Sequence, residues 1–398
     1  MEPKRKTRKN NGDGTVYQVN ENKWVAKIQI GTKPDGKPDI KQFSATTQAN
    51  VNRKLKEFKK TRGKYTSQNI KSISFTEYID KWLYTRKRLE LKDSSFDRLE
   101  STIKIHIKPN IGLLQMSKVG ADDIQEIITN LYEKNLSYST VKKVYDAFNA
   151  CFEYAKTNRD IDYNPVDGVS KPSEKNFKTK GAKFFSEEEV KLLLAELKST
   201  YSTGKQKYQY ADAYILMLNT GIRMGECLGI HKEDISLEEK TLYIRRNVVT
   251  IRKRENKEDI SEITGYEIRV QNDAKTNYSE RIIDLNDNAI IAARSLLAKN
   301  PNSPLLVATK NDKVVSPSTF TKSFYAVLDN AGIGRCGLHT LRHTFASMLF
   351  KNGVNAKTVS EILGHSSVKI TYDTYIHLIR EQKQDAVRVL DALGAGTV

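Results

Sequence analysis

The chain has 398 residues, of which 38% are hydrophobic and 9% are aromatic. Because roughly 100–200 residues make one domain, this length predicts two or three domains and excludes a single small module. Charged residues make up 29% and the mean hydropathy is -0.58, as in a folded, water-soluble protein. No window approaches the roughly 18 apolar residues of a membrane span, and residues 1–10 lack the apolar core of a signal peptide. We therefore expect a cytoplasmic location.

Positive charge gives the first indication of function. Lys and Arg number 66 against 48 Asp and Glu, a formal net charge of +18. Residues 1–70 contain 17 of the basic and 6 of the acidic residues, so more than half of the excess lies in less than a fifth of the chain. Such a concentration favours a polyanionic partner through counterion release, with a solubilising terminus as the alternative.

A small basic sheet is predicted near the N-terminus. Apolar residues alternate from Trp24 to Ile30, a first strand is predicted at 15–19 and a third at 40–43, and a basic helix follows at 47–60. Because a β-ribbon can lie in the major groove of DNA, we expect this module to bind DNA. The expected DNA-contacting residues are Arg5, Lys6, Arg8, Lys9, Lys23, Trp24 and Lys27, with Arg86 and Lys142 further along the chain.

The second segment is predicted to be helical throughout. Phe75, Tyr78, Ile79, Trp82 and Leu83 have the spacing of one apolar helical face. Further helices are predicted at 96–107, 121–134 and 139–157, and no strand pattern interrupts them. We therefore predict a small all-α domain. Taken by itself, this pattern fits a purely structural helical bundle as well as a DNA-binding domain.

Residues 164–184 hold two prolines, two glycines and many lysines, and we predict a linker there. A capping box at 186–189 then begins a larger domain. A strand region lies within 241–285, and an amphipathic helix at 381–393 is a candidate for docking on a partner. The other helices of this domain are predicted at 187–200, 208–219, 287–299, 317–331, 340–352, 356–363 and 367–379.

Four stretches of this domain combine cationic and imidazole side chains. They are 219–226 (NTGIRMGE), 274–281 (AKTNYSER), 339–343 (HTLRH) and 363–365 (LGH), and Tyr375 follows the last of them. Their order and spacing closely resemble the Arg, Lys, His-x-x-Arg, Leu-Gly-His and Tyr boxes of the tyrosine recombinase (phage-type integrase) family. One box arises easily by chance, whereas five in order are a specific signal.

The resemblance implies a multidomain fold: an α+β N-terminal three-stranded sheet plus helix, an all-α core-binding domain, and a mainly-α catalytic domain with a small antiparallel sheet. All but the extreme N-terminus is covered. We expect an arm-type DNA-binding domain at 1–65, the core-binding domain at 73–163, a linker at 164–184, the catalytic domain at 185–380, and a C-terminal helix and tail at 381–398.

The resemblance also implies a covalent mechanism. In the family a tyrosine attacks a DNA phosphodiester and leaves a 3′-phosphotyrosyl link and a free 5′-hydroxyl, and a second strand's hydroxyl later reverses the step. Tyr375 occupies the nucleophile's position. A phenol has a pKa of about 10, so the reaction needs a proton acceptor and cations around the phosphorane. Arg223 and Arg342 are implied to bind the non-bridging oxygens through their planar guanidiniums.

Four further roles follow from the same resemblance. His339, one helical turn before the second arginine, is expected to accept or share the tyrosine's proton. His365 is expected to donate a hydrogen bond to a non-bridging oxygen, and Lys275 to protonate the departing 5′-oxygen. Glu226 is expected to support the first arginine. No metal or other cofactor is implied, because the phosphotyrosine conserves the energy of the broken bond.

Some assignments have competitors. Tyr372 lies one turn before Tyr375 and is the rival nucleophile. His339 and His343 have the spacing of a zinc-binding helix, but Thr340 stands where the HExxH motif has its glutamate, so zinc is not expected. The lysines that compete with Lys275 are Lys253, Lys257 and Lys313.

We predict a site-specific recombinase that integrates and excises a mobile element, either a conjugative transposon or a prophage. It is expected to work as a homotetramer on two DNA duplexes with core-type and arm-type sites, away from membranes. An excisionase and a DNA-bending protein are candidate partners. The alternatives are a non-catalytic DNA-binding regulator, since 345–363 has a helix-turn-helix pattern, and a type IB topoisomerase with the same tyrosine chemistry.

Overall fold

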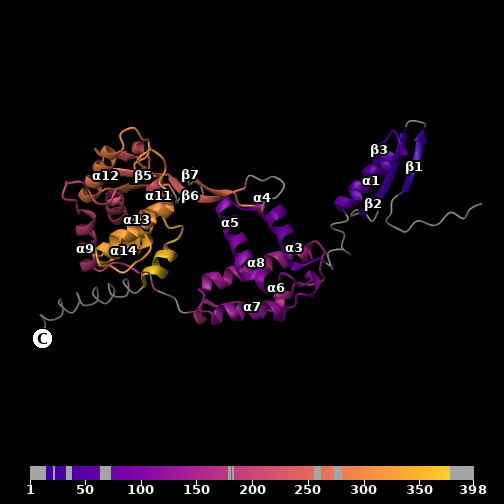
Figure 1. Ribbon diagram of the computed structural model, residues 1–398. Helices are drawn as coiled ribbons and strands as arrows, with labels where there is room; N and C mark the ends of the chain where they lie inside the picture. The colour runs from indigo at the N-terminus through magenta and orange to yellow at the C-terminus, as the bar shows by residue number, and fades with distance from the viewer. Residues whose placement is uncertain are drawn as a thin grey trace, which may run out of the picture. The chain divides into compact units, whose positions relative to one another are not determined.

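The structure is a computed structural model (Figure 1) that describes residues 15–20, 23–32, 38–62, 73–177, 181, 183–254, 261–272 and 280–376. The chain divides into two compact units. The first comprises residues 1–87 and 99–174, and the second comprises residues 88–98 and 175–398. Among the described residues, no helix has the length and apolar character needed to cross a bilayer.

The predicted N-terminal sheet is present. Strands β1 (Thr15–Asn20), β2 (Lys23–Thr32) and β3 (Pro38–Ala45) pair antiparallel in that order, and helix α1 (Gln48–Arg62) packs on the sheet (Figure 1). The alternation along β2 places Ala26 and Ile28 against Val51 and Leu55 of α1, which together form a small separate core.

The second segment is helical, as its periodicity predicts. All five residues of the apolar face that begins at Phe75 are buried. Phe75 contacts Phe152 with ring centroids 5.3 Å apart, which joins the first helix to the last. The elements are α3 (Phe75–Lys81), a π-helical stretch (Trp82–Lys87), α4 (Arg88–Glu90), α5 (Asp93–Thr102), a second π-helical stretch (Ile103–Ile107), α6 (Lys108–Ile111), a 3₁₀ turn (Met116–Lys118), α7 (Ala121–Glu133) and α8 (Tyr138–Thr157).

Part of the stretch expected as a linker is folded. Residues Pro165–Gly168 form a 3₁₀ turn that packs against α7 and α8, with Pro165 and Val166 buried. Asn164 caps this turn through its side chain. A second 3₁₀ turn covers Glu174–Asn176, and the division between the two units falls between Glu174 and Lys175. Because the stretch has no periodic pattern, its sequence did not indicate that Pro165, Val166 and Val169 are buried. The domain boundaries stay predictions.

The second unit combines helices with two small antiparallel sheets. One sheet has the order β4-β5-β8, and β6 and β7 form the other. Short α11 was not predicted, because six residues are too few to show a helical period. The elements are α9 (Glu187–Leu197), α10 (Ala211–Thr220), α11 (Met224–Gly229), a 3₁₀ turn (Lys232–Asp234), β4 (Ile235–Ser236), β5 (Thr241–Ile244), β6 (Arg246–Lys253), β7 (Gly265–Asn272), β8 (Arg281–Asp284), α12 (Asp287–Lys299), α13 (Pro317–Asn330), α14 (His339–Lys351) and α15 (Ala356–Leu363).

Helix α10 lies at the centre of this unit. Nearly all of its side chains are buried, and it packs against α9, α12 and α14. A helix that is apolar all round is expected in the interior. It ends at Gly221, which has a φ of +66° and lies two residues before Arg223 in the stretch 219–226. Residues 368–376 are also helical and carry Tyr375, whereas residues 381–393 lie outside the described part of the chain.

Gly221→Ala should destabilise the fold strongly. A Cβ at this position would lie 2.4 Å from the ring of Phe345, in a left-handed backbone conformation. Strain and overpacking together should cost about 2–4 kcal/mol of the free energy of unfolding. Gly332→Ala is the matched control, because Gly332 has a φ of +69° but no atom within 4 Å of its added Cβ, and it should cost about 1 kcal/mol. Urea denaturation measures both, and equal losses would contradict this account.

Candidate active site

A buried carboxylate bridges two arginines. Arg223 is the N-cap of α11, and its backbone N–H and side-chain Nη1 donate to Glu226 at 2.8 and 2.7 Å. Arg281, at the start of β8, donates to the same carboxylate through Nη1 and Nη2 at 3.2 and 2.9 Å. Glu226 is 2% exposed. Burial alone would raise its pKa, but the charges of Arg281 and Arg223 outweigh burial and lower the pKa to about 2.

Three arginines from separate stretches meet at the C-terminal end of α15. Arg281 Nε donates to the carbonyl oxygen of Ile362 at 2.8 Å, Arg342 Nη2 to the next carbonyl at 2.8 Å, and Arg223 Nη2 to the one after it at 3.2 Å. The last carbonyls of a helix have no intrahelical partner and form the negative end of its dipole. The end of α15 therefore gathers the guanidiniums of Arg223, Arg281 and Arg342.

Arg342 is the most deeply placed of the three and is 4% exposed. Its Nη1 also donates to the carbonyl oxygen of Gly221 at 3.0 Å. Burial, followed by the positive charge of Arg223, lowers its pKa to about 9, so the guanidinium stays charged at neutral pH. Two backbone bonds use two of its five N–H groups. In the part of the chain that the structure describes, Glu226 supplies the one carboxylate bonded to these three guanidiniums. The excess of positive charge favours the entry of an anion.

The phenol of Tyr375 is bonded to a histidine that the sequence had not assigned. His343 Nδ1 and Tyr375 Oη lie 2.7 Å apart, with the rings edge to face. Tyr375 is 1% exposed and packs with Phe350 and Leu363. Burial raises its pKa to about 12, although the charge of Arg342 acts in the opposite direction. Its rival Tyr372 is 42% exposed.

The two histidines of the predicted set occupy different environments. His339 begins α14, and part of its surface is exposed to solvent. Partial desolvation of its imidazole, followed by the charges of Arg342 and Arg223, lowers its pKa. His365 is partly buried, and its Nδ1 lies 2.7 Å from the hydroxyl of buried Thr371. Burial and the neighbouring arginines lower the pKa of His365 to about 4. With Nδ1 occupied, Nε2 is the nitrogen of His365 that can bind a ligand.

The structure thus brings together Arg223, Glu226, Arg342 and His365, with His339 and Tyr375 on adjoining helices. Lys275 lies outside the described residues, as do Arg5, Lys6, Arg8 and Lys9. The sequence did not indicate two residues that contact this set. Arg281 ends the predicted lysine stretch, but its partner Glu226 lies 55 residues earlier, so no local pattern indicates their contact. His343 has the spacing of a zinc ligand with His339, and the sequence gives no sign of its contact with Tyr375.

The expected DNA-contacting residues that the structure describes lie on surfaces. Lys23 and Lys27 are exposed on β2, where Lys27 Nζ lies 5.6 Å from the ring centre of Tyr17, and Trp24 is half-buried. Arg86 lies over the ring of Tyr154 at 5.7 Å. Lys142 pairs with Asp146 at 2.5 Å, which offsets its charge.

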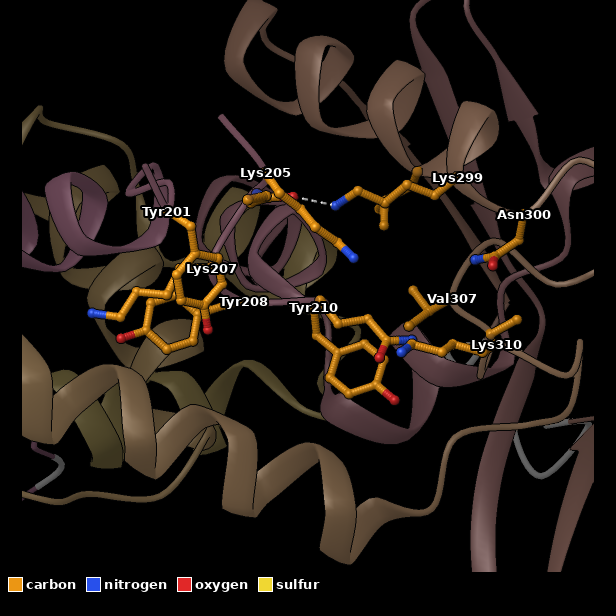
Figure 2. Close-up of a pocket in the computed structure, with 13 residues that line it drawn as sticks. Tyr201, Lys205, Lys207, Tyr208, Tyr210, Lys299, Asn300, Val307 and Lys310 are labelled. Carbon is orange, nitrogen blue, oxygen red and sulfur yellow. Dashed lines mark hydrogen bonds between the residues drawn. The ribbon is translucent and has the colours of Figure 1, made fainter. Parts of the chain in front are cut away.

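A cavity of about 480 Å³ lies elsewhere in the same unit (Figure 2). Tyr208 and Tyr210, which line it, precede α10, whereas Arg223 follows the opposite end of this helix, about 15 Å away by helix length. Of the predicted catalytic residues that the structure describes, none lines this cavity. In the described residues, no three His, Cys, Asp or Glu side chains gather as a metal site requires.

Comparison with known proteins gives consistent matches. The phage integrase family model matches residues 183–382, and the model of the phage integrase N-terminal SAM-like domain matches residues 74–132. A XerC-like tyrosine recombinase of Caldanaerobacter subterraneus subsp. tengcongensis is 26% identical over 385 residues, which cover 92% of this chain and 95% of that one.

Two solved structures share the fold. The Tn1549 transposon integrase, in complex with a circular intermediate DNA, is 19% identical with a TM-score of 0.62, over 79% of this chain and 99% of that chain. The lambda integrase tetramer bound to a Holliday junction is 15% identical with a TM-score of 0.55, over 91% and 97%.

The family model covers half of the chain, and the chain therefore belongs to the phage integrase family. It is a tyrosine site-specific recombinase, a DNA-binding enzyme of DNA recombination.

Glu226→Gln should cost about 3–5 kcal/mol of unfolding free energy at pH 7. The variant leaves the Arg281 side chain, which is 8% exposed, and the 36% exposed side chain of Arg223 without their carboxylate. The folded pKa of about 2 lies below the ordinary value of 4.5. Glu226 therefore stabilises the fold fully above pH 4.5, and this contribution declines as the pH falls toward 2. The difference between the variant and the unmodified protein should shrink between pH 5 and pH 3.

The control is Glu187→Gln, since Glu187 is an exposed partner of Lys351 at 3.4 Å and should contribute less than about 1 kcal/mol. Denaturant titration over this pH range measures both variants. A deficit of Glu226→Gln that does not change with pH would contradict the assigned ion pairs.

Proposed function

We propose that the chain integrates and excises a mobile element through a 3′-phosphotyrosyl intermediate and strand exchange. One observation carries this proposal: Arg223, Arg342 and His365 lie together at the C-terminal end of α15. Tyr375 packs in the same apolar cluster as residues of α14 and α15. Three stretches, of which the first lies more than a hundred residues before the other two, supply groups suited to one phosphate. A structural ion-pair network would not require the histidine and the tyrosine.

In this proposal the scissile phosphate binds beside the three guanidiniums. Arg223 and Arg342 donate to its non-bridging oxygens, and His365 donates through Nε2. The carboxylate of Glu226 does not balance the charge of three guanidiniums, and the phosphate supplies further negative charge. Binding of the phosphate should therefore raise the lowered pKa values of Arg342 and His365. Donors held in place before the reaction stabilise the phosphorane without further rearrangement.

The covalent step joins Tyr375 Oη to phosphorus and breaks the bond to the 5′-oxygen. The phenolic proton passes to His339 or to a water beside it, and Lys275 supplies the proton that the departing 5′-oxygen takes. The 5′-hydroxyl of a second strand then attacks the phosphotyrosine, which regenerates the phenol. Glu226 holds Arg223 in place throughout.

The domain assignment completes the proposal. Residues 1–65 bind arm-type DNA, and residues 73–163 contact the core site. Residues 164–184 link the core-binding domain to the catalytic domain, and residues 185–380 carry out the chemistry. The working assembly is a homotetramer on two duplexes, with residues 381–398 contacting a neighbouring protomer. An excisionase and a DNA-bending protein are candidate accessory partners.

A mobile element is favoured over simple relaxation of supercoils by the separate basic sheet of β1, β2 and β3, which a topoisomerase acting at one site does not need. The helix-turn-helix pattern that suggested a regulator corresponds to α14 and α15. Ala346 and Phe350 of α14 pack in one apolar cluster with Val359 and Leu363 of α15 and with Tyr375 of the helix at 368–376. This packing supports a role of the pair in building the site.

Tyr375→Phe should abolish covalent attachment to DNA. The unmodified protein, incubated with a nicked suicide duplex, should give an adduct that survives a denaturing gel, and the adduct should form equally well in EDTA. Tyr372→Phe is the matched control and should retain the adduct within about twofold. An adduct that persists in Tyr375→Phe, or cleavage that stops in chelator, would contradict the proposed chemistry.

Lys23 and Lys27 should contribute to the salt dependence of arm-DNA binding. Each phosphate contact contributes about 0.9 to the slope of log affinity against log salt. The double variant Lys23→Ala/Lys27→Ala should lower the slope by about 2, measured by fluorescence anisotropy. Lys191→Ala, on α9 of the other unit, should leave it unchanged. An unaltered slope in the double variant would remove β2 from the DNA interface.

A further inference from the structure

His343 holds the phenol of the proposed nucleophile. It lies on α14 one turn beyond His339, and its Nδ1 is 2.7 Å from Tyr375 Oη. At neutral pH a phenol and an imidazole are both uncharged, so the phenol donates and Nδ1 accepts, provided that the ring proton is on Nε2. None of the five boxes of the sequence pattern assigns a role to this histidine.

The hydrogen bond from Tyr375 to His343 helps to hold the phenol in a buried environment. The phenol ring is 1% exposed, and its centre lies 5.3 Å from that of Phe350 and 5.8 Å from that of His343. Ala346 of α14 and Val359 and Leu363 of α15 belong to the same buried apolar cluster. A DNA phosphorus must approach the phenolic oxygen to a bonding distance, which a buried oxygen does not allow. The segment at 368–376 therefore has to move before Tyr375 can react.

We propose that His343 is a positioning residue that retains Tyr375 in this buried state until DNA is bound, and releases it for cleavage. The inference rests on the proposed role of Tyr375 as nucleophile. It assigns His343 no proton transfer in the reaction itself. Burial and the charges of His339 and Arg342 lower the pKa of His343 to about 4, and such an imidazole is a poor proton acceptor from a phenol whose pKa is about 12.

The sequence offers a local reference for the measurement. Tyr372 is 42% exposed and lies on the same helical stretch. Trypsin cleavage after Lys369 and Arg380 would release both tyrosines in one peptide, residues 370–380. N-acetylimidazole transfers its acetyl group to exposed phenolic oxygens, and fragment mass spectra locate the acetyl group on either tyrosine. The ratio of acetylation at Tyr375 to that at Tyr372 thus reports how often the phenol is released.

The test compares two substitutions in the full-length protein without DNA. His343→Phe keeps a ring of similar size but removes the acceptor, whereas His343→Asn keeps an acceptor close to the position of Nδ1. One neutral hydrogen bond changes an equilibrium by roughly two- to tenfold. Acetylation of Tyr375 relative to Tyr372 should rise by about this factor in His343→Phe and stay near the unmodified value in His343→Asn. Circular dichroism checks that both variants are folded.

Adduct formation on the suicide duplex separates retention from catalysis. His343→Phe should form the covalent adduct at least as fast as the unmodified protein in a single turnover. An unchanged acetylation ratio in His343→Phe would overturn the inference, as would equal increases in both variants. A raised ratio with a more than tenfold loss of adduct would also overturn it, because His343 would then act in the reaction. Failure of the proposed function appears separately, as an adduct that persists in Tyr375→Phe.

Discussion

The C-terminal end of one short helix organises the whole site. Three successive carbonyl oxygens, from Ile362 to Gly364, accept hydrogen bonds from Arg281, Arg342 and Arg223. These oxygens lack helical partners and lie at the negative end of the helix dipole, so each guanidinium satisfies a group that would otherwise be costly to bury. Because the three arginines come from distant stretches, their convergence depends on α15 ending where it does. His365 directly follows Gly364 in the chain and therefore lies at the same end of α15.

Two left-handed turns and one carboxylate keep this arrangement in place. Gly364 ends α15 with a φ of +65°, and Gly221 ends α10 with a φ of +66° and presents its carbonyl to Arg342. The carboxylate of Glu226 binds two of the three guanidiniums, those of Arg223 and Arg281, and offsets part of their positive charge. One carboxylate against three cations leaves positive charge in a largely buried setting, where charge interacts strongly. The same residues that stabilise the fold therefore leave a net positive charge, which suits the phosphate that we propose binds here.

One contact of the candidate site depends on local spacing and could be predicted from the sequence. Arg223 and Glu226 are three residues apart, and their contact is the N-terminal cap of α11. Helices such as α7 and α8 also followed from periodicity, since one face of each is buried. Helix α10 differs, because nearly all of its side chains are buried. The contact between Tyr375 and His343 could not be predicted, because it depends on how the helix at 368–376 packs on α14. The bonds of Arg281 likewise span 55 and 81 residues, a separation that no local pattern encodes.

We propose that these separate groups surround a single phosphorus. A crystal structure of the protein with cleaved core DNA and vanadate, which takes the geometry of the phosphorane, tests it most directly. We expect a pentacoordinate vanadium bonded to Tyr375 Oη, with Arg223, Arg342 and His365 within hydrogen-bonding distance of its equatorial oxygens. A vanadium bonded to another side chain, or lying beyond the reach of both arginines, would contradict the account.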